Sequence, residues 1–230
     1  ASQAERYSKY KNDPELPDIL MNMIKKDDHV SFYENHGHRT IESLTHEWNC
    51  KLYPNPSIPA SIVTDVFVNH HVSHAALGYY TRPWTSKDDT VILTVDGAGE
   101  QQCMGIYDSN FNLLEKELVP KSLGYFYSFT TRYLKLRPME DEYVVMGLAS
   151  YGSPVVGEQL CNEFTKLDTL SWTDAAIPDN DPRVDVGEIL QRLYKNQTKE
   201  DVAASVQYLA KKIILDYAHR ARKYGSKLVY

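Results

Sequence analysis

Two short segments rich in β-branched and aliphatic side chains constrain the fold most, because each runs directly into a polar motif. Residues 64–68 (TDVFV) lead into a histidine-rich stretch at 69–76, and residues 90–95 (TVILTV) lead into residues 96–99 (DGAG). Segments of this length and composition are typical of strands, whereas helices need longer periodic stretches. The pattern predicts an α/β protein whose strands end at residues that form a functional site.

Other segments extend this α/β pattern. Further strands are expected at residues 5–10, 103–107, 113–119 and 227–230, with a turn at 108–110. Helices are expected to begin at Asp13, near residue 41 and at Ser122, and a long one is expected to run from a cap at Thr198 to a stop at Gly225.

The polar stretch 81–89 is the best candidate for a domain boundary, because it contains Arg82-Pro83 and shows no periodicity. We therefore divide the chain into residues 1–86, which carry the histidine motif, and residues 87–230, which carry the DGAG segment and a helical insertion. The chain begins without a methionine and stops within an apolar stretch. We expect the fold to be incomplete at both ends.

Charge and cysteine content exclude several classes of protein. The 25 Lys and Arg residues against 31 Asp and Glu residues give a net charge of −6, which argues against binding to nucleic acid or to an anionic membrane. Apolar runs are too short to span a bilayer. Cys50, Cys103 and Cys161 form no CxxC pair, so neither a disulfide framework nor a thiolate zinc site is expected. These features predict a cytoplasmic protein.

The histidine motif is the strongest candidate for a metal site. On a helix, His70 and His74 stand four residues apart on one face, so both rings can reach one metal ion, whereas His71 points elsewhere. A helix N-terminus also disfavours the charged imidazolium and thereby favours the neutral ring that binds metal. The alternative is that one histidine is buried and hydrogen-bonded while the others are exposed.

The DGAG segment has two functional interpretations. Gly97 and Gly99 allow backbone N–H groups to approach a phosphate closely, and Asp96 is a hard oxygen ligand for a cation. The alternative is an ordinary hairpin turn, because Asp-Gly is a favoured turn pair. If Asp96 and the two histidines face one crevice, the three ligands form a catalytic type of metal site.

A third candidate region contains Ser122, Gly124 and Glu142. Ser122 and Gly124 lie at an expected helix start, where small residues allow close approach of a ligand. Residues 140–143 are acidic, and residues 146–152 contain small residues that allow helices to pack closely. The alternative is that these residues only pack helices or form a solvated acidic turn.

Five segments together resemble one family. They are residues 4–11 (AERYSKYK), 69–76 (NHHVSHAA), 95–100 (VDGAGE), 122–127 (SLGYFY) and 141–149 (DEYVVMGLA). Their order and spacing are similar to those of the nodulation-type O-carbamoyltransferases. The resemblance implies a ribonuclease H-like, two-lobe fold of the actin, sugar-kinase and Hsp70 type, similar to the tRNA threonylcarbamoyl-adenosine synthase subunit.

The resemblance also implies roles for individual residues. His70, His74 and Asp96 look like the ligands of a divalent metal, which is iron, zinc or manganese. Gly97 and Gly99 look like a nucleotide-phosphate loop. The implied residues of the nucleotide pocket are Ser122, Gly124 and Glu142. His71 is assigned from its position as a general base on the acceptor hydroxyl.

In such enzymes, carbamoyl phosphate and ATP give a carbamoyl adenylate, whose carbamoyl group passes to an acceptor hydroxyl. The resemblance therefore implies a sugar-like or natural-product acceptor, an adenylate-forming domain outside these 230 residues, and a homodimer as one partner arrangement. It implies neither a nucleic-acid nor a membrane partner. We expect the isolated chain to be inactive towards carbamoyl phosphate.

Two positions depart from the family pattern. Val144 stands where the family usually has lysine, and Lys121 stands where it tends to have histidine. These departures leave two alternatives open. One is a catalytically silent nucleotide- or metal-binding module, and the other is a relative that acts on tRNA or in hydrogenase maturation.

Overall fold

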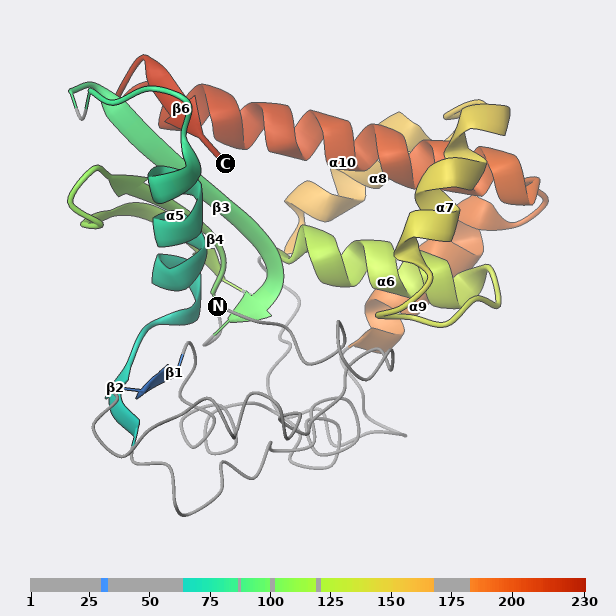
Figure 1. Cartoon of the computed structure of the whole chain (residues 1–230). Helices are drawn as coiled ribbons and strands as arrows, with labels where there is room; N and C mark the ends of the chain where they lie inside the picture. Colours follow the sequence, from blue (N-terminus) through green and yellow to red (C-terminus); the bar gives the residue numbers. More distant parts are fainter. Residues whose placement is uncertain (1–29, 33–63, 87, 100–101, 119–120, 168–182) are drawn as a thin grey trace.

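The computed structural model describes residues 30–32, 64–86, 88–99, 102–118, 121–167 and 183–230 (Figure 1). Three sequence-based predictions lie outside these ranges: the strand at 5–10, the helix from Asp13 and the helix near residue 41. The family motif at residues 4–11 also lies outside them.

A four-stranded sheet forms the centre of the described structure. Its order is β5-β4-β3-β6, from β3 (Thr90–Gly99), β4 (Gln102–Asp108), β5 (Leu113–Leu118) and β6 (Lys227–Val229). The first three strands are antiparallel, and β6 runs parallel to β3. All four strands were predicted from the sequence, and their existence is confirmed.

The end of β3 differs from the prediction. We expected the strand to stop at Val95 and the DGAG segment to be a loop. Instead β3 continues to Gly99, with an irregular register between Val95 and Gly99 where it pairs with β4. Asp96, Gly97 and Gly99 therefore lie within an extended strand and not in a separate loop after it.

A second, two-stranded sheet precedes the histidine motif. Strand β2 (Thr64–Phe67) pairs in parallel with β1 (Val30–Phe32) and leads after two residues into helix α5 (His70–Thr81). The prediction of β2 and of the helix after it is confirmed. β1 was not predicted, because three residues carry too little pattern for a prediction.

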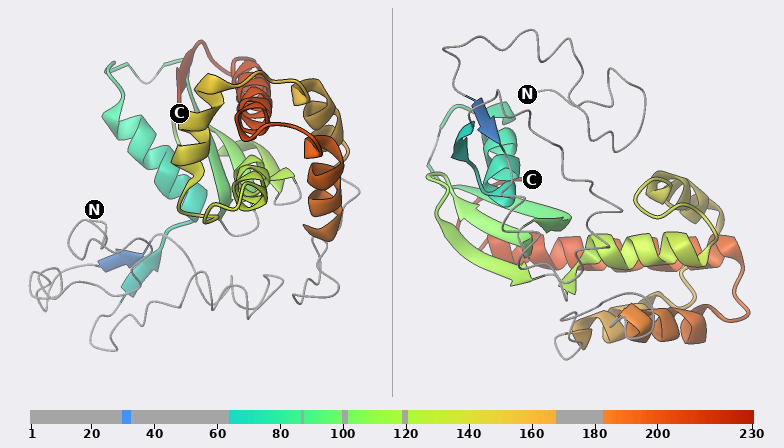
Figure 2. Two further views of the ribbon diagram at one scale, coloured as in Figure 1. Left: turned by 90° about the vertical axis from the view of Figure 1, so that its right-hand side faces the viewer. Right: turned by 90° about the horizontal axis from the view of Figure 1, so that it is seen from below.

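Helices cover both faces of the four-stranded sheet (Figures 1 and 2). On one face, Ala75 and Tyr79 of α5 pack against Ile92 of β3. On the other face, the last turns of α10 (Lys199–Ala221) pack against Val91 of β3 through Tyr217. Burial of both faces explains why residues 90–95 are almost continuously apolar.

The remaining helices form a second core beside the sheet. They are α6 (Leu123–Tyr133), α7 (Glu142–Leu148), the short 3₁₀ helix η2 (Ala149–Tyr151), α8 (Gly157–Thr165) and α9 (Arg183–Tyr194). The first half of α10 packs among them, while its last turns lie under the sheet, so one helix belongs to both parts (Figure 2). The predicted cap at Thr198 is confirmed, because its side chain accepts a hydrogen bond from the N–H of Asp201. The helix ends at Ala221, four residues before Gly225.

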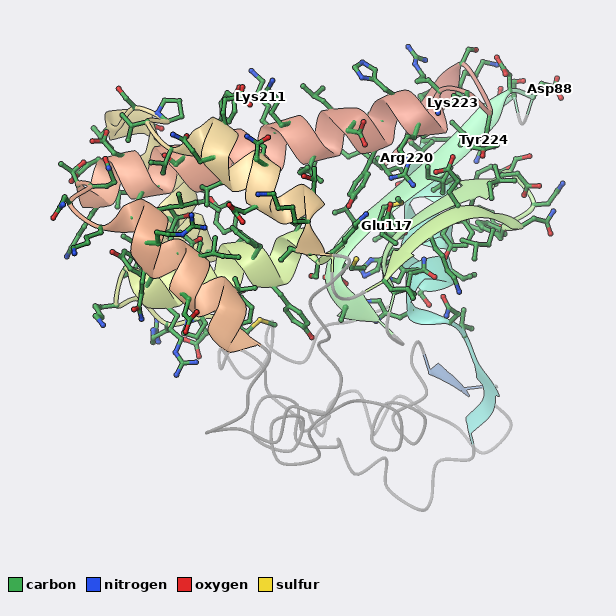
Figure 3. All side chains as sticks on the ribbon, turned by 180° about the vertical axis from the view of Figure 1, so that it is seen from behind. Asp88, Glu117, Lys211, Arg220, Lys223 and Tyr224 are labelled. Carbon is green, nitrogen blue, oxygen red and sulfur yellow. The ribbon has the colours of Figure 1, made fainter. Side chains whose placement is uncertain are left out.

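An ion-pair network joins α10 to the outer strand of the sheet (Figure 3). The guanidinium of Arg220 lies 2.6 Å from Glu115 Oε2 and 2.7 Å from Glu117 Oε1, both on β5. The hydroxyl of Tyr224 also donates to Glu115, at 2.9 Å. The hydrogen bond with Arg220 lowers the pKa of Glu115, so this carboxyl stays ionised. The network therefore fixes the end of α10 against an edge strand.

The structure confirms a mixed α/β protein. The boundary near residue 86 stays a prediction, and α5, which precedes it, shares a core with β3, β4 and β6, which follow it. Within the described residues, no helix combines the length and the apolar character needed to cross a membrane.

Candidate metal centre and adjoining cleft

The start of α5 places two histidines on one face of the helix. Asn69 caps the helix, because its side-chain oxygen accepts a hydrogen bond from the N–H of Val72 at 3.1 Å. His70 is therefore the first helical residue, and His74 follows one turn later. Helical spacing brings both rings towards the neighbouring strand β3.

Asp96 on β3 meets both histidines. Its Oδ2 atom lies 2.6 Å from Nε2 of His70 and 3.0 Å from Nε2 of His74. The two Nε2 atoms are themselves 3.0 Å apart. The structure thus brings together the three residues that the sequence suggested as metal ligands: His70 and His74 from successive turns at the start of α5, and Asp96 from the sheet.

The chemistry and spacing of these three atoms fit a divalent metal. One ligand atom from each of His70, His74 and Asp96 lies within 4.8 Å of the others. Ligands at zinc distances in a tetrahedral site are ~3.4 Å apart, so a small opening of this cluster admits an ion. Two imidazoles and one carboxylate suit zinc, iron and manganese, and they leave coordination positions for water or a substrate.

Gly99 makes room for the ring of His70. A Cβ atom at Gly99 would lie 2.4 Å from the His70 ring, closer than any real contact. Gly99 is buried at this position. The missing side chain at Gly99 therefore makes room for His70, and the suggested contact of Gly99 with a phosphate stays a prediction.

Asp96 is ionised in this environment. Burial by itself raises the pKa of its carboxyl, but hydrogen bonds from His70 and His74, together with the N–H of Gly97, hold that pKa well below its usual range. The hydrogen bond with Asp96 in turn raises the pKa of His74, and burial opposes this effect. The cluster thus provides a fixed negative charge between two imidazoles.

The surroundings of His71 bear on its suggested role as a general base. Its side chain is fully buried, with Nε2 2.8 Å from the carbonyl oxygen of Gln102 and Nδ1 2.9 Å from Oγ1 of Thr94. Burial lowers the pKa of His71 to about 4. Because both ring nitrogens already have protein partners, the geometry does not support a general base that reaches an acceptor hydroxyl.

A cleft of about 590 Å³ adjoins the metal-ligand cluster and shares Asp96 with it. Its lining includes Gly97, Gly124 and Glu142, three of the residues suggested for the nucleotide site. Glu142 accepts hydrogen bonds from the hydroxyl of Ser128 at 2.7 Å and from the N–H of Met139 at 2.6 Å. Val144, which replaces the family lysine, is not among the described residues that line the cleft.

The sequence did not reveal several lining residues of the cleft. Tyr127 donates to Gln207 across it at 2.8 Å, and burial together with Glu142 raises the pKa of Tyr127 to about 12. These two residues are 80 positions apart in the sequence, so only the fold brings them together. Tyr143 and Met146 of α7 add a partly exposed apolar wall.

Ser122 supports the site without lining the cleft. Its buried hydroxyl donates to the carbonyl oxygen of Gly97 at 2.5 Å and accepts the N–H of Tyr125, which caps α6. A Cβ atom at Gly124 would lie 2.7 Å from Cα of Gly97. The two small residues therefore hold the start of α6 directly against the strand that carries Asp96.

The comparison with known protein families identifies the class of this chain. Residues 58–228 match the family model described as "Carbamoyltransferase N-terminus". The match covers well over half of the chain, and the protein belongs to this family. The predicted resemblance to nodulation-type carbamoyltransferases is confirmed.

Three relatives illustrate the range of similarity. The uncharacterised protein sll1178 of Synechocystis sp. is 24% identical over 94% of this chain and 43% of its own length. Nodulation protein NolNO of Sinorhizobium fredii is 36% identical over 44% of this chain and 15% of its own length. Nodulation protein NolO of Bradyrhizobium diazoefficiens is 29% identical over 68% of this chain and 29% of its own length. The chain therefore spans less than half the length of these relatives.

Proposed function

We propose that this chain is the part of an ATP-dependent O-carbamoyltransferase that transfers a carbamoyl group from carbamoyl adenylate to an acceptor hydroxyl. The observation that carries the proposal is the meeting of His70, His74 and Asp96 beside a cleft, in a chain of the carbamoyltransferase family. A related enzyme acting on tRNA and a silent binding module are less well supported, because the family match favours a carbamoyltransferase.

The sheet supports the two-lobe, actin-like fold that we propose for the whole protein. Three antiparallel strands are followed by a fourth strand that runs parallel to β3, and helices lie on both faces. In α/β folds of this kind, ligands gather at the ends of the central strands. Asp96 near the end of β3 has this position.

The residues of the centre have separable tasks. His70 and His74 would hold the divalent metal together with Asp96, whose carboxylate is oriented by the N–H of Gly97 at 2.6 Å. When bound, the metal supplies positive charge that stabilises developing negative charge on oxygen. Ser122 and Gly124 keep the strand segment at Asp96 in place against α6.

The transfer step involves one bond exchange. The acceptor oxygen forms a bond to the carbamoyl carbon, the bond from that carbon to the phosphate oxygen of the adenylate breaks, and AMP and the hydroxyl proton are released. Glu142, Gln207 and Tyr127 offer hydrogen-bonding groups within the cleft, beside the exposed ring of Tyr143. Such a mixture of polar groups and aromatic rings suits a sugar-like, hydroxyl-rich acceptor.

Preformed carbamoyl adenylate tests this proposal, because it bypasses the adenylate-forming domain. The purified chain is mixed with zinc, iron or manganese, carbamoyl adenylate and a panel of sugars and amino sugars, and AMP release and product mass are measured. We expect metal-dependent release of AMP above the spontaneous rate. We expect none from carbamoyl phosphate and ATP with the chain alone.

Two pairs of variants control the experiment. Asp96→Asn and His74→Ala are expected to lower the metal-dependent rate at least 100-fold. Asp216→Asn and His219→Ala change the same residue types at exposed positions of α10 and are expected to keep the rate. Equal rates in Asp96→Asn and the unmodified chain would show that the proposed centre does not carry the reaction.

A further inference from the structure

We propose that His71 is a positioning residue for the metal centre. Its ring joins the first turn of α5 to β3 and β4, and this connection sets the angle at which His70 and His74 meet Asp96. The inference rests on the proposed function, because it concerns the geometry of the same metal ligands.

The hydrogen bonds of His71 define a single arrangement of its ring. The carbonyl oxygen of Gln102 can only accept, so Nε2 of His71 carries the proton and donates to it at 2.8 Å. Nδ1 is then an acceptor, and the hydroxyl of Thr94 donates to it at 2.9 Å. The ring is thus fixed from both sides, by β4 through Gln102 and by β3 through Thr94.

These bonds lie beside the metal ligands on both elements. His71 follows His70 directly in α5, and Thr94 precedes Asp96 by two residues on β3, which places their side chains on the same face of the strand. The ring centroid of His71 is 5.6 Å from that of His70 and 6.2 Å from that of His74. The helix and the strand are therefore joined by two adjacent sets of contacts, one through His71 and one through Asp96.

The other contacts of α5 with the sheet are less directional. Ala75 and Tyr79 pack against Ile92 and Tyr107 through apolar surface, which favours contact without fixing the rotation of a helix about its axis. Hydrogen bonds do fix it, because they require defined distances and angles. A small rotation of α5 would separate Nε2 of His74 from Asp96. The His74 side chain is 48% exposed, against 13% for His70, so fewer neighbouring atoms hold its ring in place.

Burial strengthens the constraint that the two hydrogen bonds of His71 place on α5. A buried imidazole with unpaired nitrogens is costly, whereas a fully paired one rigidifies its surroundings. The His71 side chain has no exposed surface, so water does not compete for its two bonds. Removal of groups that hydrogen-bond directly to metal ligands typically changes metal affinity 10- to 100-fold, and we take this range as the expectation for His71, which acts on the ligands through α5 and β3.

The test compares metal binding in four variants of the full chain. His71→Leu removes both hydrogen bonds of the ring and keeps most of the bulk, and His71→Gln restores a donor and an acceptor. Thr94→Val keeps the bond to Gln102 and removes the bond to Nδ1, together with the longer contact of the Thr94 hydroxyl with the carbonyl oxygen of Gly105 at 3.4 Å. Tyr79→Leu is the matched control, because it disturbs packing of the same helix on the same sheet face two turns away. Zinc affinity is measured by competition, and the visible spectrum of bound cobalt reports the ligand geometry.

We expect zinc affinity to fall 10- to 100-fold in His71→Leu and less in Thr94→Val, both with an altered cobalt spectrum. His71→Gln should recover most of the affinity, and Tyr79→Leu should lower the melting temperature while affinity and spectrum stay unchanged. The proposal is overturned if the folded His71→Leu and Thr94→Val proteins bind zinc with unchanged affinity and show the unmodified cobalt spectrum.

A metal-free measurement separates this proposal from the proposed function. Long-range ¹H–¹⁵N correlation spectra of the histidine rings report the proton position on His71 and the surroundings of His70 and His74. If the unmodified chain takes up no metal, the metal centre of the proposed function fails. Positioning by His71 is then supported if the ring signals of His70 and His74 move in Thr94→Val but not in Tyr79→Leu, and is overturned if they stay in place.

Discussion

The hydroxyl of Ser122 donates a hydrogen bond to the carbonyl oxygen of Gly97, 2.5 Å away and 25 residues earlier in the chain. The hydroxyl oxygen of Ser122 also accepts a hydrogen bond from the N–H of Tyr125 and thereby caps α6. One side chain thus begins a helix and also holds the strand segment that follows Asp96. Loss of this side chain should affect both the stability of the protein and the candidate metal site at Asp96.

We expect Ser122→Ala to lower the free energy of unfolding by about 1–2 kcal/mol, since it removes a helix cap and a buried hydrogen bond. Zinc affinity should fall as well, because Asp96 loses a constraint. Urea unfolding and zinc competition measure the two effects. Thr198→Ala removes a similar cap from α10, far along the chain from Asp96, and should lower stability alone. Equal zinc affinity in both variants would contradict the link between Ser122 and the centre.

Gly99→Ala should displace the ring of His70, because the added methyl group would lie 2.4 Å from it. We expect zinc affinity to fall at least tenfold, with destabilisation of about 1–3 kcal/mol from overpacking. Gly147→Ala is the matched control, since a methyl group there meets no atom within 4 Å. Because this helical position is exposed, Gly147→Ala should raise the free energy of unfolding by up to about 1 kcal/mol and leave the zinc affinity unchanged. Zinc titration of the two purified variants decides between these expectations.

The buried ring of His71 predicts a loss of stability in acid. Burial lowers the pKa of His71 from 6.5 to about 4 in the folded protein, so between these pH values the unfolded chain binds a proton that the folded protein does not. Stability should therefore decrease as the pH falls from 6.5 to 4, by about 3 kcal/mol from this residue. His71→Gln does not titrate at this position, and its unfolding free energy should depend less steeply on pH. Identical slopes for the two proteins would contradict the prediction.

Arg220→Gln should destabilise the contact between α10 and β5. The substitution leaves Glu115 and Glu117 on the same face of the strand without the charge that lies between them. Because all three side chains are partly exposed, we expect a loss of about 1–2 kcal/mol that shrinks as salt is added. Lys211→Gln, at an exposed position of the same helix, should change stability by less than about 0.5 kcal/mol. Chemical unfolding at low and high salt measures both changes.

Local sequence signals predicted much of the fold. The strand-like residues at 90–95, the helix start in residues 69–76 and the cap at Thr198 depend on neighbours a few positions away, and the structure contains each of them. The extension of β3 to Gly99 was missed, because Asp-Gly is more typical of a turn than of a strand. The pairing with β4 that keeps this segment extended is not visible in a local pattern.

The three candidate metal ligands could be predicted from the sequence, whereas the residues that hold them in position could not. Helical spacing pointed to His70 and His74, and a carboxylate after an apolar strand pointed to Asp96. The bonds of His71 to Thr94 and Gln102 were missed, because they join residues more than 20 positions apart. The sequence also did not reveal that the missing side chain at Gly99 makes room for the ring of His70, whereas the phosphate contact suggested for Gly97 and Gly99 stays a prediction.

Helix α10 has a mechanical consequence for the cleft. Gln207 and Ala210 form part of the cleft wall, and Tyr217 and Ala221, about two to four turns further along the helix, pack against the sheet. A continuous helix acts over this distance as a stiff rod. A molecule that displaces the cleft wall would therefore also displace the sheet that carries Asp96. Helix α10 thus couples occupancy of the cleft to the arrangement of His70, His74 and Asp96.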